Sequence, residues 1–134
     1  MKRILFAVLG VSLLTAGCGD PVPPAAPTPV APTITETFSD TLLVLGSNTH
    51  QFTVGQVGGV KVTLNSVNPS ATVGIGIGTS ATGTCAVLSN TTAVDGASVQ
   101  LSGTATVAGT FCVSVYDVGN LVEPVTYTVT VLHS

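Results

Sequence analysis

Histidine is the side chain that most readily moves protons at neutral pH, and this 134-residue chain has two, His50 and His133. A hydrolase would need one of them beside a serine nucleophile and a carboxylate. Serines are plentiful, but the chain lacks the G-x-S-x-G turn that exposes such a nucleophile. We expect His50 to be a solvated strand residue and His133, next to the last residue, to be frayed. The sequence therefore predicts a protein that is not an enzyme, with a small hydrolase using His50 as the alternative.

Metal binding has one candidate, in the segment "YDVGN". Asp117 and Asn120 could offer oxygen ligands to calcium there. Asp and Asn in a Gly turn more often accept hydrogen bonds from their own backbone. The chain has no H-x-x-x-H, C-x-x-C or EF-hand spacing. We therefore predict no metal and no cofactor, with a calcium-dependent binder using Asp117 as an alternative.

The first of three cysteines, Cys18, follows a targeting signal. Lys2 and Arg3 precede eleven mostly apolar residues, 4–14, and small residues come next. Eleven residues are too few to span a bilayer, which takes about 20. The pattern is that of a secretory signal.

The stretch Thr15-Ala16-Gly17-Cys18 resembles the lipobox of bacterial lipoproteins, although the position held by Thr15 is usually Leu. The resemblance implies cleavage before Cys18, attachment of acyl chains such as palmitate to that cysteine, and a membrane anchor in the cell envelope. Gly19 is not the Asp that retains some lipoproteins at the inner membrane, so the resemblance implies the outer membrane. The alternative is an ordinary cleavable signal followed by a chance cysteine.

The chain is expected to divide into a signal (1–17), a lipidated cysteine with a Pro-rich linker (18–33) and one domain (34–134). Six of the eight prolines lie in residues 20–33. Proline fixes φ and removes an N–H donor, so the linker is predicted to form polyproline II. At about 3.1 Å per residue it reaches roughly 40 Å. An SH3-type ligand is the alternative for this tract.

Charged residues make up only 7% of the chain, and its formal net charge is −3. There is no basic cluster, so we expect no nucleic-acid partner. After signal cleavage, Lys61 is the one basic residue against six carboxylates. Such a chain is not drawn to anionic lipid by charge, so the acyl chains at Cys18 must provide the anchoring.

Apolar and polar side chains alternate from residue 34 onward, without a helical period. Such alternation is typical of antiparallel sheets with one face in a core. We expect strands at Thr35–Asp40, Thr49–Val54, Val60–Val67, Ala71–Gly78, Cys85–Ser89, Ser98–Ser102, Phe111–Val115 and Val125–Val131. Turns are expected at Gly46-Ser47-Asn48, Gly58-Gly59, Asn68-Pro69, Asp95-Gly96, Ala108-Gly109 and Gly119-Asn120. About eight short strands predict an all-β antiparallel sandwich or jelly roll.

Cys85 and Cys112 remain once Cys18 is acylated. In an exported protein we expect them to form a disulfide, worth about 3–4 kcal/mol. Neighbouring strands lie about 4.8 Å apart and facing sheets about 10 Å apart. The bridge is therefore predicted to join neighbouring strands of one sheet and to lie toward its outer face. A reduced pair is the alternative.

Several segments resemble, in order, the bacterial pre-peptidase C-terminal (PPC) domain, which is a β-sandwich module. They are "TFSDTLLVLGSNTHQFTV", "GGVKVTL", "AGTFCVSVYDVGN" and "VTYTVTV". The family often has acidic residues before the aromatic residue of its second strand, where this chain has Asn48 and His50 before Phe52. Some relatives bind calcium and collagen through acidic clusters, and with so few carboxylates neither property carries over.

No set of residues points to a reaction. The sequence predicts a non-enzymatic lipoprotein module at the cell surface or in the periplasm, which binds a protein or glycan or supports the envelope. Sugars stack on exposed aromatic rings, and Tyr116 is the expected exposed ring because it alternates away from Val115. The "GIGIG" segment (74–78) lacks the Lys and helix of a phosphate loop, so its glycines are expected to mark bulges or close packing.

Overall fold

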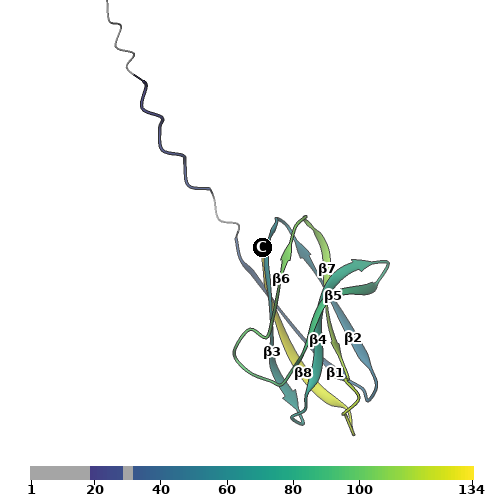
Figure 1. Ribbon diagram of the computed structural model, residues 1–134. Helices are drawn as coiled ribbons and strands as arrows, with labels where there is room; N and C mark the ends of the chain where they lie inside the picture. The colour runs from purple at the N-terminus through teal and green to yellow at the C-terminus, as the bar shows by residue number, and fades with distance from the viewer. Residues whose placement is uncertain (1–18, 29–31) are drawn as a thin grey trace, which may run out of the picture.

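The computed structural model describes residues 19–28 and 32–134, and over these residues it contains β-strands but no helix (Figure 1). Within the same part of the chain, nothing helical is long and apolar enough to cross a membrane. The signal and Cys18 lie outside the described residues. The strands are β1 (Ile34–Leu42), β2 (Ser47–Val54), β3 (Gly58–Asn68), β4 (Val73–Ala81), β5 (Thr84–Ala93), β6 (Leu101–Ala105), β7 (Gly109–Tyr116) and β8 (Val125–His133).

The eight strands form two antiparallel sheets of four, in the orders β1-β8-β3-β6 and β2-β7-β4-β5. The first strand pairs with the last, the second with the seventh, the third with the sixth and the fourth with the fifth. The chain is therefore one long hairpin that is rolled into two layers, which is the strand order of a jelly roll. The predicted fold class is confirmed.

The core lies between the two sheets and follows the alternation of the sequence. In β8, Tyr127 and three valines are buried, and the intervening threonines are more exposed. The core also takes Val73, Ile75 and Ile77 from β4. The period of two places every second side chain of a strand on one face, so the polar outer faces and apolar inner faces arise from the same pattern.

Several predicted boundaries differ from the observed ones, and at two of them side-chain and cross-strand bonds override the local turn signals. The sixth strand begins at Leu101 rather than at Ser98, because Gln100 is used to pin the preceding loop. Its Oε1 accepts the Leu64 N–H at 2.8 Å, and its amide donates to the Val94 carbonyl at 3.3 Å. Gly58-Gly59 is part of β3 rather than a turn, since these residues pair with β6.

The glycines of the "GIGIG" segment are close-packing positions, as expected. Ile75 and Ile77 face the core, whereas Gly74, Gly76 and Gly78 face outward. A Cβ on Gly74 would overlap the ring of Tyr116, and one on Gly76 would lie 2.8 Å from a methyl of Val87. The side chains of neighbouring strands therefore cover this part of β4 from outside the sandwich.

Candidate functional site

Cys85 and Cys112 form the predicted disulfide, with a Cα–Cα distance of 5.8 Å. The prediction that they lie on neighbouring strands is wrong, because β4 runs between β5 and β7. The bridge passes over Gly78, which pairs with Cys112. With no side chain there, the backbone of β5 approaches so closely that a Cβ on Gly78 would lie 2.6 Å from the Ala86 carbonyl carbon. The bridge lies on the outer face of the sheet as expected, since Cys112 alternates with core residues.

Tyr116 is not the exposed ring that the sequence predicts. It is half-buried, and its ring packs against Gly74 on the neighbouring strand β4. One face of the ring is thereby occupied, so the side chain serves as packing rather than as a free platform for a sugar.

Asp117 uses both carboxylate oxygens on backbone N–H groups. Oδ2 accepts the Leu45 N–H at 2.8 Å, and Oδ1 accepts those of Gly119, Asn120 and Leu121 at 2.8, 3.1 and 3.2 Å. These bonds, that from Leu45 foremost, hold the pKa of Asp117 below its ordinary value. The carboxylate ties the β1–β2 turn to the β7–β8 loop, as the preference for backbone bonding predicted. Asn120 enters this arrangement through its backbone, and the geometry favours a loop clamp over a calcium site.

His50 is not a solvated strand residue. It stacks on Phe38 of β1, with ring centroids 4.9 Å apart, and its Nε2 lies 2.6 Å from the hydroxyl oxygen of Tyr127. Burial lowers the pKa of His50, and Asp40 partly opposes that shift. Burial raises the pKa of Tyr127 to about 12. A phenol that is harder to deprotonate than usual is not an activated nucleophile. The role of His50, Phe38 and Tyr127 is therefore packing, which closes this side of the sandwich.

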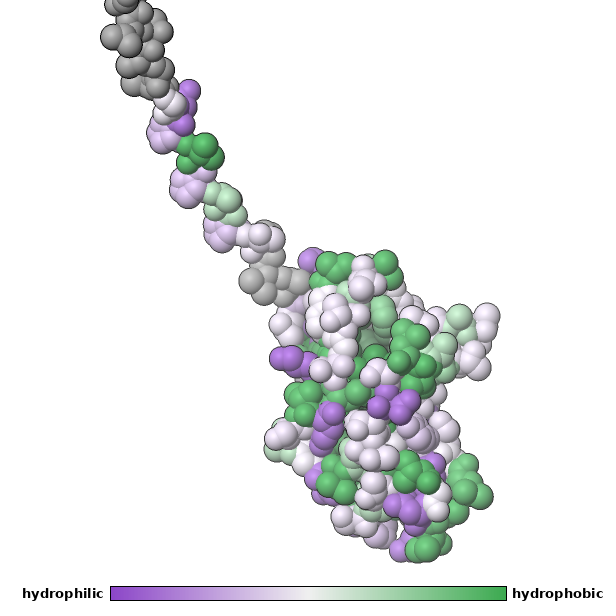
Figure 2. All heavy atoms as spheres, in the orientation of Figure 1, coloured by the Kyte–Doolittle hydropathy of each residue, from purple (hydrophilic) through white to green (hydrophobic). Residues whose placement is uncertain are grey.

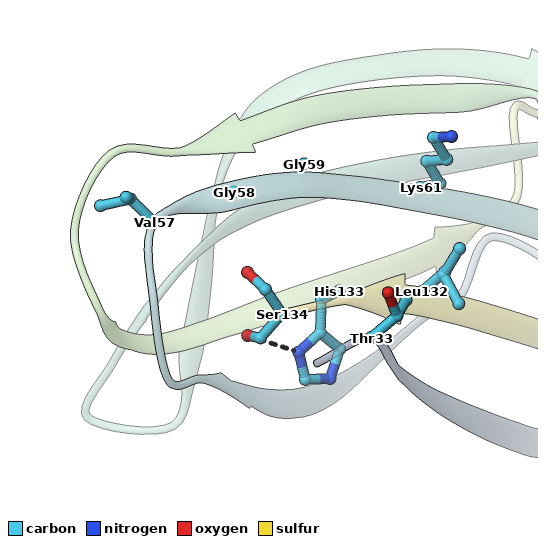
Figure 3. A pocket seen from close by; sticks show the side chains of 8 residues that line it. All are labelled: Thr33, Val57, Gly58, Gly59, Lys61, Leu132, His133 and Ser134. Carbon is cyan, nitrogen blue, oxygen red and sulfur yellow. Dashed lines mark hydrogen bonds between the residues drawn. The ribbon is translucent and has the colours of Figure 1, made fainter. Parts of the chain in front are cut away.

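The prediction that His133 is frayed is also wrong. It is the ordered last residue of β8 and is only 1% exposed. Its Nε2 lies 2.8 Å from a carboxylate oxygen of Glu36 on β1. It borders a cavity of about 340 Å³, where its ring also contacts the Ser134 carbonyl (Figure 3). Figure 3 shows that Lys61, another lining residue, extends away from His133, so its ammonium group does not join the pair of His133 and Glu36.

Over residues 19–28 and 32–134, His, Cys, Asp and Glu side chains nowhere gather in threes around a point that could hold a metal ion. The most distinctive surface is apolar instead. Two loops that share Asp117 carry five exposed aliphatic side chains, which we call the apolar tip: Leu43, Val44, Leu45, Val118 and Val122. Figure 2 shows apolar surface at this end of the sandwich, among polar atoms.

The apolar tip lies at the end of the sandwich away from the linker. The linker enters at Ile34, which pairs with His133 at the end of β8. β1 then runs the length of the sheet, and its turn follows Leu42. β7 ends beside that turn, since Tyr116 pairs with Ser47. The domain therefore presents these loops on the side opposite its attachment point.

Leu45 is the most unusual residue of the tip. Its φ is +57°, a conformation that costs a residue with a Cβ roughly 1–2 kcal/mol. Its side chain is 82% exposed, so it gains almost no packing in return. The sequence contained a signal for this surface in the apolar run "LLVLG", because three or more exposed apolar residues in a row are uncommon in a turn. The turn itself is Leu43 to Gly46, and the predicted turn residues Ser47 and Asn48 belong to β2.

Comparison with known proteins finds no family model that matches the chain. It finds no matching curated protein either. The interpretation of the apolar tip therefore depends on its own chemistry.

Proposed function

We propose that this chain is a non-enzymatic binding module of the bacterial cell envelope, anchored by acyl chains on Cys18 and held away from the membrane by its Pro-rich linker. In a bacterium with two membranes, the anchor lies in the outer one. The observation that carries the proposal is the apolar tip at the end of the domain opposite the linker. An anchor at one end and an exposed apolar surface at the other suit a protein that binds a partner at a distance from the membrane.

The strain at Leu45 supports a binding role for the tip. A Gly in that position would adopt the same backbone without strain, and the exposed leucine contributes little to the core. Strained backbone that brings no packing benefit is commonly found where function requires a particular side chain. The clamp by Asp117 holds Leu45 in this conformation before any partner arrives, which lowers the entropy cost of binding.

The chemistry of the tip favours a protein partner over a glycan. Its side chains are aliphatic and offer no aromatic ring on which a sugar could stack. Exposed aliphatic groups gain most by transfer to another apolar surface. An apolar patch on a protein of the envelope is therefore the proposed ligand.

The alternatives of a small hydrolase or a calcium-dependent binder receive less support. His50 is hydrogen-bonded to the hydroxyl of Tyr127, whose pKa is raised to about 12. Both carboxylate oxygens of Asp117 accept hydrogen bonds from backbone N–H groups, four in all. We also propose that the domain is related to the PPC family. The ordered resemblance of four segments supports this relation, and a two-sheet sandwich is compatible with it.

The anchor is tested by changing Cys18 to Ser in the full chain. We expect the variant to leave the membrane fraction for the soluble fraction while the domain stays folded. Mass spectrometry of the mature N-terminus gives the sharper measurement. A wild-type N-terminus without acyl chains would refute the anchor.

The tip is tested with a photo-reactive amino acid at position 122, which is 93% exposed in the wild type. In living cells the full chain should form adducts with an envelope protein through this position. Leu43→Lys should abolish the adducts. Val57→Lys is the matched control, because Val57 is 63% exposed against 61% for Leu43 and lies at the linker end. Equal adduct formation by the two lysine variants would contradict binding through the tip.

A further inference from the structure

The two open sides of the sandwich are unequally protected against pairing with another strand. β1 and β2 form one side, and β5 and β6 form the other. On β1, Glu36 and Asp40 alternate with Thr35, Thr37 and Ser39, so they share the inward face with Phe38. Charged residues that point inward on an edge strand are a common defence against unwanted pairing.

The opposite side lacks such inward-pointing charges. β5 reads "TCAVLSNTTA" and β6 reads "LSGTA", without a charged residue or a proline. Most residues of β5 are exposed. A neutral, exposed edge strand presents a row of unpaired N–H and C=O groups to any other strand that approaches.

A bulge displays one apolar side chain on this edge. Ile77 pairs with Ser89 and Gly78 with Val87, so Leu88 is the extra residue between them. Leu88 is 74% exposed and borders an apolar groove of about 150 Å³, which opens between the two sheets. Val60, Ile77, Ala105 and Phe111 contribute to its walls. Bulges often serve to re-aim a side chain, and here the result is an aliphatic group beside an apolar opening.

We propose that the β5–β6 edge binds the same edge of a second copy of this chain, with β5 antiparallel to its counterpart. A twofold axis makes an antiparallel strand pair self-complementary. In such a pair, the two Leu88 side chains and the apolar grooves that they border become part of the contact. The two four-stranded sheets that contain β5 then become one continuous sheet across both copies.

The distribution of charge selects a second copy as the occupant. Between residues 32 and 134 the chain has five carboxylates and one lysine, so two copies repel each other over most of their surfaces. The edge strands β2, β5 and β6 carry no Asp, Glu, Lys or Arg, but β2 lies beside the acidic β1. The β5–β6 side is therefore the one where two acidic copies can meet without juxtaposing like charges. The nearest carboxylate in sequence, Asp95, follows the end of β5, and antiparallel pairing places the two copies of it at opposite ends.

The size of the edge is adequate for a weak but specific dimer. The bulge at Leu88 interrupts β5, and the five residues after it, 89–93, give a regular edge about 17 Å long at about 3.3 Å per residue. With β6 and the groove beside it, the contact covers on the order of 1,000 Å² in total, near the lower limit for specific interfaces. Anchoring in a membrane raises the local concentration, which favours pairing without new contacts.

The pairing is tested by photo-crosslinking in cells, with the reactive amino acid at position 90 of the full chain. Asn90 is an exposed residue of β5. We expect an adduct of twice the chain mass whose linked peptides both derive from this protein. The same probe at position 122 should give no such adduct. The proposal would be overturned if position 90 gave adducts only with other proteins. It would also be overturned if both positions gave adducts between two copies of this chain.

A second measurement separates this interface from the apolar tip. Two differently tagged full chains are co-expressed, and one is purified through its tag. We expect Leu88→Lys to reduce recovery of the other chain at least tenfold, because it places a charge in both copies of the contact. Leu43→Lys is the control and should leave recovery unchanged. Equal recovery from Leu88→Lys and wild type, with both folded by circular dichroism, would refute the pairing.

Discussion

Gly78→Ala should open the disulfide without changing a cysteine. A Cβ on Gly78 would overlap the carbonyl oxygen of Ala86 and lie 2.6 Å from its carbonyl carbon, whereas ordinary contacts begin at 3.4 Å. The obstacle is backbone, which cannot rotate away as a side chain can. β5 must therefore move outward by at least about 0.8 Å to restore an ordinary carbon contact, and further to clear the oxygen.

The bridge has little room for this movement. Its Cα atoms are 5.8 Å apart, and disulfides become strained beyond about 6.8 Å. Displacing β5 takes the separation to about that limit or past it. If the bridge fails to close, the chain-entropy model predicts a loss of about 3–4 kcal/mol for a loop with this separation of 27 residues. In a domain of about 100 residues, that loss lowers Tm by roughly 10–25 °C.

Gly59→Ala is the matched control, because no atom lies within 4 Å of a Cβ at that strand position. The measurements are Tm by circular dichroism and free-thiol titration of the unfolded, unreduced proteins. We expect two free thiols and the large Tm loss in Gly78→Ala only. Similar Tm values for the two variants, with no free thiol in either, would refute the account of β5 crossing over Gly78.

Three further predictions concern the loops and the buried phenol. Asp117→Asn should lower Tm at neutral pH because the amide cannot accept every N–H that the carboxylate accepts. Since the pKa of Asp117 is lowered by folding, this deficit should begin to shrink below about pH 4 and should vanish as pH falls through the lowered pKa, where the folded wild type loses its carboxylate. A deficit that is constant down to about pH 2 would contradict the clamp. Tyr127 should stay protonated until about pH 12, so the ultraviolet transition near pH 12 should be absent from the titration of Tyr127→Phe. The stability that Tyr127 contributes through this shift, at most about 2–3 kcal/mol, is present below pH 10 and is lost as pH rises through 12. Leu45→Gly should raise Tm slightly, because it relieves about 1–2 kcal/mol of backbone strain and costs roughly 0.5–1 kcal/mol through the greater entropy of the unfolded chain. The same variant should also form fewer adducts at position 122. An unchanged yield of adducts would show that Leu45 is not part of the binding surface.

Local chemistry was enough to predict the layers of this fold. The alternation in "VTYTVTV" determines which face of β8 is buried, because the side-chain period of a strand is two whatever its partners are. The backbone bonding of Asp117 followed from its place in a Gly turn. The number of short alternating segments was sufficient to predict the sandwich, and the cysteine count was sufficient to predict the disulfide pair.

Tertiary structure decided everything that depends on which strands meet. His133 is ordered because β1 brings Glu36 to it, and His50 is half-buried because Phe38 and Tyr127 come from the opposite sheet. The bridge spans β4 because Gly78 lets β5 cross over it, a contact between residues that no local pattern links. The exposure of Leu45 and Leu88 likewise depends on a clamp and a bulge set by distant strands. A sequence determines the faces of its strands through local sterics, but register, crossings and bulges arise only when the whole chain competes for the same hydrogen bonds and the same space.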